Sequence, residues 1–389
     1  MPIFLKSLEM SADKMKRCLA RNLLNIPGWR TNHKIVVIES DDWGSIRMAS
    51  KEAYLHFLKK GYPVDKCPYN RYDALESNGD LENLFEVLAS VKDIHGNPAV
   101  LTANCVTANP DFEKIKANDF QEYFYEPFTE TLKQYPCHDR VYHLYKEGIR
   151  HKLIKPQFHG REHLNVARWM KDLQAKKKVA HDAFEMKMFS IHKIGCPENR
   201  NEYMDALYFE TPAEKERLKQ SVAEGALIFE KTWGFLSKSF IAPSYIWDDV
   251  IETVLNRNGV DYIQGVAVQR IPEKQSPDGY SSKYHFQGQR NSFGQRYLIR
   301  NVFFEPTQLP GFDWVSDCMN RIKIAFRWHK PAIISTHRLN YIGCLDPANT
   351  TRSLPLFARL LMKIIKNWPD VEFMSSDQLG NLMNGVNGP

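Results

Sequence analysis

The sequence predicts an α/β fold, an irregular barrel of seven or eight mostly parallel strands wrapped by helices. Short β-branched runs alternate along the 389 residues with longer stretches of helical periodicity, which is typical of parallel strands joined by helices. Acidic or histidine clusters directly follow three of these runs, between Asp41 and His337. Because barrels carry their chemistry at the carboxyl ends of the strands and no linker separates the clusters, one domain is expected to hold all three.

Strands are expected wherever an apolar run is short and bounded by polar residues. The first covers residues 35–40, is apolar on both faces and opens into Asp41-Asp42-Trp43-Gly44, the pattern of a buried parallel strand that ends in a loop. The other strands are expected at residues 99–103, 155–158, 239–242, 260–265, 297–304, 332–336 and 371–373.

Helices are expected to fill the gaps between the strands. The clearest has Thr211 as N-cap and Pro212 at its first position, followed by apolar residues at helical spacing. Another covers residues 352–368, and Ser375 or Ser376 is expected to cap a last helix.

Two segments stand apart from this alternation. Residues 1–28 predict a basic amphipathic helix, which we expect to pack on the barrel rather than to bind a membrane surface, because its apolar stripe is modest. Residues 272–294, rich in Gln, Ser, Gly and Lys, predict a polar insertion. We expect it to border the cleft and help to select the substrate, and the alternative is a loop elsewhere on the surface. The chain from residue 29 to residue 389 is otherwise predicted to be a single catalytic domain.

The composition argues against several classes of protein. The 52 basic and 46 acidic residues are interspersed and leave a net charge of only +6, which argues against a nucleic-acid partner. The seven cysteines are scattered without a C-x-x-C pair, as expected in a reducing compartment. No uninterrupted apolar stretch could serve as a secretory signal or a membrane span, so the sequence predicts a cytoplasmic location.

Each of the three clusters contains groups that could bind a metal ion or move a proton. Asp41 and Asp42 are adjacent carboxylates, so one can hold a cation while the other accepts a proton, although a solvated acidic turn explains the pair equally well. His159 and His163 are four residues apart, so they would face the same side of a helical turn and could hold one metal ion through their imidazoles. His337 ends a buried strand, where a histidine on its own is more often structural.

The second cluster has another interpretation. His159-Gly-Arg-Glu-His163 matches the H-x-x-E-H pattern of inverted zinc proteases, in which Glu162 would be the general base. That interpretation requires a regular helix and a third ligand from a later helix. Pro156 and Gly160 argue against an established helix at this place.

Four motifs follow one another at predicted strand ends. They are Ser40-Asp41-Asp42-Trp43-Gly44, His159-Gly-Arg-Glu-His163, Phe240-Ile-Ala-Pro-Ser-Tyr245 and Ile334-Ser-Thr-His337. In this order they resemble the polysaccharide deacetylase family, carbohydrate esterase family 4, which has the NodB-homology fold. The resemblance covers roughly residues 33–385. It implies a barrel like those of deacetylases and glycoside hydrolases, and a metal-dependent hydrolase that removes N- or O-acetyl groups from a sugar or polysaccharide.

The resemblance also implies a role for each motif residue. With zinc as the expected ion, the ligands of a divalent metal would be Asp42, His159 and His163. Asp41 would be the general base and His337 the general acid. The backbone N–H of Ser244 would help to bind the oxyanion.

The third motif departs from the family in one residue. Ile241 stands where the family has an arginine that pairs with the catalytic base. Arg161 or Arg338 is expected to substitute for it, or else Asp41 has no paired cation. This departure makes a non-catalytic carbohydrate-binding protein on the same fold the main alternative to a deacetylase, ahead of the zinc peptidase.

An acetylated sugar or oligosaccharide is the expected partner. Sugar faces stack on aromatic rings, and aromatic and basic side chains lie near the predicted motifs, although such aromatic residues are more often simply part of the core. The residues expected to line the substrate are Trp43, Arg161, Tyr245, Trp247, Trp314 and Arg338.

Overall fold

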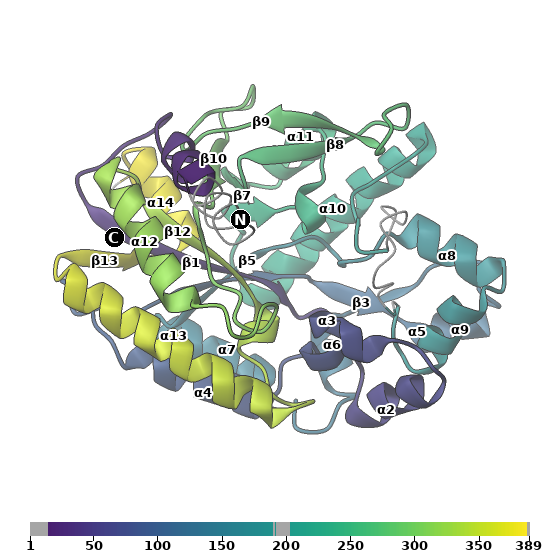
Figure 1. Cartoon of the computed structure of the whole chain (residues 1–389). Helices are drawn as coiled ribbons and strands as arrows, with labels where there is room; N and C mark the ends of the chain where they lie inside the picture. Colours follow the sequence, from purple (N-terminus) through teal and green to yellow (C-terminus); the bar gives the residue numbers. More distant parts are fainter. Residues whose placement is uncertain (1–14, 190, 192–202, 387–389) are drawn as a thin grey trace, which may run out of the picture.

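The computed structural model describes residues 15–189, 191 and 203–386. Their central feature is a nine-stranded sheet with helices packed around it (Figure 1). Its strands are β1 (Lys34–Trp43), β2 (Leu101–Cys105), β5 (Ile154–Phe158), β6 (Ser239–Ile241), β7 (Tyr262–Gly265), β10 (Arg296–Ile299), β11 (Val302–Phe303), β12 (Ala332–His337) and β13 (Val371–Met374). Every strand that the sequence predicts is present, so the predicted α/β class is confirmed.

The large sheet closes on itself through one bent segment. All its strand pairs are parallel, in the order β10-β7-β6-β5-β2-β1-β12-β11, and β13 pairs with the first half of β1. Only Arg300 and Asn301 separate β10 from β11. The Arg300 N–H donates to Gly265 O of β7 at 2.8 Å, and the Asn301 N–H donates to Ile333 O, on β12, at 3.2 Å. The segment predicted as one strand thus pairs with both neighbours and completes the predicted barrel.

The side chains of β1 alternate between the inside of the barrel and the surrounding helices. Ile35 and Val37 belong to an apolar cluster formed with β10, β12 and the last helix. Val36 and Ile38, which alternate with them, pack in the larger cluster beneath the outer helices. Glu39 and Asp41 are the next residues with the same parity, and both are buried. The interior is therefore apolar at the amino ends of the strands and acidic toward their carboxyl ends.

Helices surround the barrel, and α12 and α13 pack side by side on one flank (Figure 1). The helices are α2 (Lys51–Lys59), α3 (Pro68–Tyr72), α4 (Asn78–Ala89), α5 (Phe112–Ala117), α6 (Phe128–Leu132), α7 (Val141–Arg150), α8 (Val166–Gln174), α9 (Lys178–Glu185), α10 (Pro212–Trp233), α11 (Asp249–Arg257), α12 (Trp314–Arg327), α13 (Pro347–Asn367) and α14 (Ser376–Met383). Within the part of the chain that the structure describes, no helix is both long and apolar enough to cross a membrane.

The caps explain where the predicted helices begin. Thr211 accepts a hydrogen bond from the Glu214 N–H at the start of α10, as predicted. Ser375 caps α14 in a capping box. Helix α13 begins at Pro347 rather than at residue 352, because the side chain of Asp346 accepts from the Ala348 N–H and adds more than one turn before the periodic residues.

Of the two segments set apart by their composition, the first is described in part and the second throughout. Residues 15–24 are helical and adjoin α12, while residues 1–14 of the predicted N-terminal helix lie outside the described residues. The polar insertion contains part of a hairpin formed by β8 (Val268–Pro272) and β9 (Tyr280–Tyr284). Tyr280 Oη donates to Asp205 Oδ2 at 2.8 Å, so the hairpin packs on the segment that also contains Met204. Because Met204 O accepts from Ser244 Oγ at 3.4 Å, the insertion lies near the predicted site, and its effect on substrate choice stays a prediction.

Candidate metal and hydrolytic site

The two carboxylates after the first strand lie at the carboxyl end of the barrel. In a regular strand Asp41 and Asp42 would point to opposite faces of the sheet. Here the pairing register of β1 with β2 shifts between Ser40 and Trp43, and Asp42 has a φ of 77°. This local irregularity turns the Asp42 carboxylate toward the histidines of the second motif, while Asp41 stays with the interior row.

His159 and His163 are brought together by a loop and not by a helix. Residues 159–165 have no helical turn, and Gly160 has a φ of 96°, a conformation that favours glycine. The two imidazole centroids lie 5.1 Å apart. Helix α10 lies directly on this loop, because a Cβ at Gly225 would come within 2.9 Å of the Arg161 backbone. The pairing was predicted correctly, but its suggested origin in a helical turn was wrong.

Asp42, His159 and His163 form a set of donors suited to one cation. His159 Nε2 lies 3.6 Å and His163 Nε2 3.5 Å from Asp42 Oδ1, and among the described residues both Asp42 Oδ1 and His159 Nε2 are buried without a hydrogen-bond partner. His159 Nδ1 lies 2.9 Å from Ile241 O, which fixes its proton there and leaves Nε2 free to coordinate. Burial lowers the pKa of His163 to about 3, so its imidazole is neutral, as a ligand must be.

The charges around this set also suit a divalent ion. Six carboxylates join through direct contacts to only four cationic groups, the arginines at 47, 300 and 338 and His337. The carboxylates are Glu39, Asp41, Asp42, Asp73, Glu76 and Glu305. Their ion pairs form two sets, each of three carboxylates and two cations, so when all carboxylates are ionised each set lacks one positive charge. A divalent cation would supply both charges. Burial raises the pKa of Glu39 and of Asp73, and a cation in the cluster would oppose that effect.

The predicted base, Asp41, has a paired arginine after all. Arg300 Nη2 and Nη1 each donate to one Asp41 oxygen at 2.7 Å, and Arg300 Nε donates to Glu39 Oε2 at 2.6 Å. Asn104 Nδ2 adds a bond to Asp41 Oδ1 at 2.8 Å. Burial by itself would raise the pKa of Asp41, but the Arg300 charge and hydrogen bonds outweigh it and hold this pKa below its usual value. Asp41 is therefore ionised at neutral pH.

Neither arginine suggested as the substitute has this role. Arg161 pairs with Glu162 and Glu224, and Arg338 is completely buried between Asp73 and Glu76. Both suggestions were wrong because they assumed that the cation follows a recognised motif. The signal for the true partner is a charged residue inside the apolar run at 297–304, which has to find a buried counter-charge.

His337, at the end of β12, has an acidic partner that the sequence did not indicate. His337 Nδ1 lies 2.6 Å from Glu305 Oε1, and its Nε2 lies 3.9 Å from Asp41 Oδ2. Burial by itself would lower the pKa of His337, but Glu305 and the two aspartates raise it to about 9. The Tyr69 ring packs edge to face on the imidazole, which remains 24% exposed. His337 is therefore protonated at neutral pH and open to solvent.

The predicted substrate-lining residues divide into two groups. Trp43 and Trp247 are 0% and 1% exposed and donate to Ser40 and Glu252, and Arg338 is equally buried, so the prediction that they line the substrate was wrong. Each is a core residue in this structure. The partly exposed residues, for which that role stays a prediction, are Arg161, Tyr245 and Trp314.

The loop of the third motif contains Ser244 and Tyr245. Both have positive φ, 55° and 57°, and follow Ile241, whose carbonyl bonds His159. Tyr245 Oη accepts from Arg300 Nη1 at 3.2 Å. The loop thus contacts Arg300, the cation paired with Asp41, and it follows directly on the strand residue that bonds the predicted ligand His159. The role of the Ser244 N–H stays a prediction.

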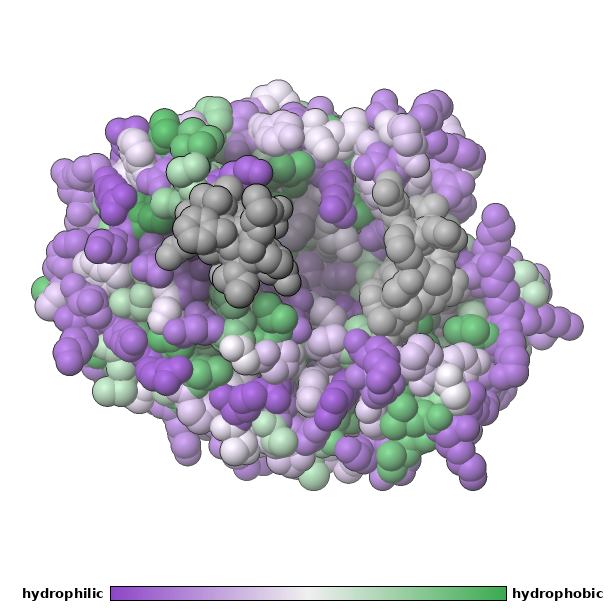
Figure 2. All heavy atoms as spheres, in the orientation of Figure 1, coloured by the Kyte–Doolittle hydropathy of each residue, from purple (hydrophilic) through white to green (hydrophobic). Residues whose placement is uncertain are grey.

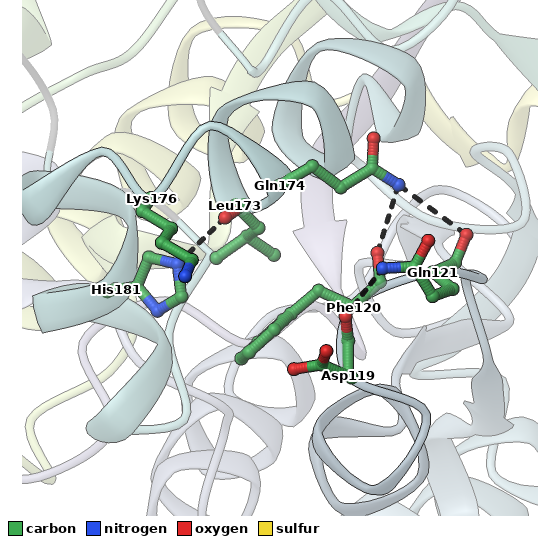
Figure 3. A pocket seen from close by; sticks show the side chains of 7 residues that line it. All are labelled: Asp119, Phe120, Gln121, Leu173, Gln174, Lys176 and His181. Carbon is green, nitrogen blue, oxygen red and sulfur yellow. Dashed lines mark hydrogen bonds between the residues drawn. The ribbon is translucent and has the colours of Figure 1, made fainter.

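The face shown in Figure 1 is hollowed near its middle, with hydrophilic residues around the hollow (Figure 2). A separate pocket of about 420 Å³ lies beside α8 and α9 (Figure 3). Two of its polar side chains are bonded to the backbone: His181 Nε2 lies 2.8 Å from Leu173 O, and Gln174 Nε2 donates to Phe120 O at 3.0 Å. These two side chains are thus already hydrogen-bonded, and the candidate catalytic residues lie at the strand ends instead.

Comparisons with known proteins give similarities to solved structures only. No family model matches the sequence, and neither does any curated protein. A Mycobacterium smegmatis protein described as a polysaccharide deacetylase is 9% identical, with 92% of this chain and 93% of that chain covered and a TM-score of 0.43. Puue allantoinase is 10% identical, with 92% of this chain and 93% of that chain covered and a TM-score of 0.46. BA3943, a CE4 family pseudoenzyme from Bacillus anthracis, is 11% identical, with 91% of this chain and 69% of that chain covered and a TM-score of 0.37.

Proposed function

We propose that this protein is a metal-dependent hydrolase that removes N- or O-acetyl groups from an acetylated sugar or polysaccharide. The observation that carries the proposal is the joint arrangement of an ionised Asp41, a protonated His337 and an unpartnered donor set beside them. The sugar is proposed on the resemblance of the four motifs to the deacetylase family. The donor set of two imidazoles and one carboxylate is typical of zinc.

Asp41 is the proposed general base. Its Oδ1 accepts two hydrogen bonds, from Arg300 and Asn104, and its Oδ2 accepts one from Arg300. Oδ2 therefore keeps a lone pair on the side where His337 lies, 3.9 Å away. A water molecule bound at this place can transfer its proton to Oδ2 as it attacks the acetyl carbonyl.

His337 is the proposed general acid. Its pKa of about 9 keeps Nε2 protonated while the substrate binds, and Glu305 at Nδ1 holds the ring in one orientation. Nε2 can therefore donate its proton to the leaving amine or alcohol when the tetrahedral intermediate collapses. The two groups begin in the protonation states that the reaction requires.

Charge on the acetyl oxygen needs stabilisation during the attack. A divalent ion held by Asp42, His159 and His163 would polarise the carbonyl and lower the pKa of a water molecule. The backbone N–H of Ser244 is proposed to donate to the same oxygen, because its loop follows the strand whose Ile241 carbonyl orients His159.

The test is acetate release from a panel of acetylated amino sugars and sugar esters by protein loaded with zinc. Asp41→Asn and His337→Ala should each lose about 10²–10⁴-fold in rate while retaining the metal. Glu162→Gln should have little effect, because both Glu162 oxygens are bonded to Arg161. Loss of activity in Glu162→Gln together with full activity in Asp41→Asn would contradict the proposal.

The alternatives have lost their structural support. Two observations count against the peptidase interpretation: residues 159–165 contain no helix, and Glu162 is paired with Arg161. The carbohydrate-binding interpretation rested on the absent arginine, and Arg300 fills that role. Absence of turnover on every acetylated sugar would instead favour the carbohydrate-binding protein over the deacetylase.

A further inference from the structure

The helix over residues 15–24 exposes its apolar side. Met15, Leu19 and Leu23 follow one another at steps of four, so they share one face, and they are 71%, 59% and 54% exposed. Ile26, just after the helix, is 38% exposed. A helix that packs on a domain for stability normally turns this stripe inward. Here it faces solvent, contrary to our expectation that the helix merely covers the barrel.

The rest of the helix is attached to the protein by polar contacts and by Leu24, which packs against the core. Arg21 Nη2 donates to Asp317 Oδ1 at 2.5 Å, and Trp328 Nε1 donates to Asn22 Oδ1 at 2.9 Å. Buried Asn25 accepts from Asn301 at 2.8 Å. The helix is therefore held in an orientation that presents the apolar stripe outward.

The chain after the helix is fixed as well. Lys330 Nζ donates to the carbonyls of three consecutive residues, Pro27, Gly28 and Trp29, at 2.7 Å each. Lys330 is 1% exposed. These contacts anchor the end of the helix to the amino end of β12, so exposure of the stripe is a property of the fold.

The neighbouring surface is basic. Helix α12 contacts both the helix over residues 15–24 and α13, so it joins the other two on this flank. Their exposed cations are Lys16, Arg17, Lys323, Arg327, Arg359, Lys363 and Lys366. Helix α13 contains no carboxylate, Asp317 is paired with Arg21 and Arg321, and Asp313 caps α12.

A second apolar area lies among these cations. An open groove of about 660 Å³ on α13 is lined by Pro355, Ala358, Met362 and Ile365, with Arg359, Lys363 and Lys366 around it. The exposed stripe of the first helix and this groove thus repeat one arrangement, apolar side chains bordered by positive charges. We name the exposed side of these three helices the basic flank.

We propose that the basic flank binds the surface of an anionic lipid membrane, with Met15, Leu19 and Leu23 inserted at the interface. A bilayer surface accepts apolar side chains and attracts lysine and arginine at the same time, each such charge strengthening binding about fivefold. A second copy of the chain would oppose equal charges, and a nucleic acid would leave the stripe in water. Charge and apolarity together therefore favour the lipid surface.

The experiment is co-sedimentation of the whole protein with phosphatidylcholine vesicles that contain or lack phosphatidylglycerol. We expect binding to the anionic vesicles that weakens as salt is added. Leu19→Glu or Leu23→Glu should reduce the apparent affinity about tenfold, because each leucine would otherwise bury roughly half of its surface in the interface. Leu227→Glu is the matched control, since Leu227 is 61% exposed on α10, outside the basic flank, and it should bind as the parent does.

Circular dichroism will show that the variants remain folded, as expected for changes at exposed positions. The proposal is overturned if the parent does not sediment with anionic vesicles, or if Leu19→Glu and Leu227→Glu bind equally. A concentration-dependent dimer that Leu19→Glu disperses, without vesicle binding, would assign the stripe to a second copy and also overturn it.

Discussion

Replacing Arg300 with methionine should destabilise the protein and shift the titration of Asp41. Arg300 is 1% exposed and makes three contacts of 2.6–2.7 Å to Glu39 and Asp41. Its removal leaves two buried carboxylates without their counter-charge. Breaking a buried pair in this way costs about 3–5 kcal/mol, a large part of the roughly 5–15 kcal/mol by which a native protein is stable.

The loss of stability in Arg300→Met should depend on pH. In the parent the pKa of Asp41 is lowered, so the pair stabilises the fold above the unfolded pKa of about 3.9, and this contribution is lost as the pH falls through the native value. In Arg300→Met, burial without the guanidinium raises the pKa of Asp41 above its unfolded value. The difference in unfolding free energy between the two proteins should thus be larger at neutral pH than near about pH 4.

The assay is urea unfolding of both proteins at the two pH values, together with the pH profile of acetate release. Because Arg300→Met alone can fail to fold, the double variant Glu39→Gln/Arg300→Met removes one orphaned charge and should recover part of the stability. Its rate should rise with pH through a higher Asp41 pKa than in the parent. A single variant as stable as the parent at neutral pH, with an unchanged profile, would refute the assignment of Arg300.

Four further predictions follow from the same geometry. Glu305→Gln should lower the pKa of His337 from about 9 toward its usual value of about 6.5, so the alkaline limb of the rate profile should move to lower pH; an unmoved limb would contradict the pairing. His159→Ala and His163→Ala should each lose bound zinc in elemental analysis after dialysis, and full metal content in both would remove them as ligands. Gly225→Ala should displace the 159–163 loop and weaken zinc binding about tenfold or more in calorimetric titration, whereas equal affinity would show that the loop tolerates the change. Shortening the hairpin between Pro272 and Tyr280 should alter preference among acetylated sugars more than it alters the urea midpoint, and an identical preference would count against a role in selection.

The strands and helices could be predicted from the sequence because each is determined by residues close together in the chain. The apolar runs of β1 and β12 bury both faces, and Thr211 and Ser375 cap helices through bonds to residues three positions away. The meeting of the three predicted metal ligands could also be predicted from the sequence, since parallel strands bring their carboxyl ends to one edge. Asp42, His159 and His163 therefore meet although the first and last are 121 positions apart (163 − 42).

The partners of the acid and the base could not be predicted in this way. Residues 297–304 were predicted to be one straight strand, in which alternation alone sets the direction of each side chain. The chain instead bends at Arg300 and Asn301 as it leaves β7 and joins β12. Which way Arg300 points is decided by this closure of the barrel, a tertiary event, and not by any local pattern.

That bend has a consequence for the chemistry as a whole. Arg300 lies at the bend and Glu305 only five positions later, so one short segment supplies both the cation that lowers the pKa of Asp41 and the carboxylate that raises the pKa of His337. The two effects have opposite signs, and together they widen the pH range in which the base is ionised while the acid is protonated. A displacement of the segment would move both pKa values toward each other and narrow that range from both sides. The segment that closes the barrel thus also sets the pH window in which the proposed reaction can proceed.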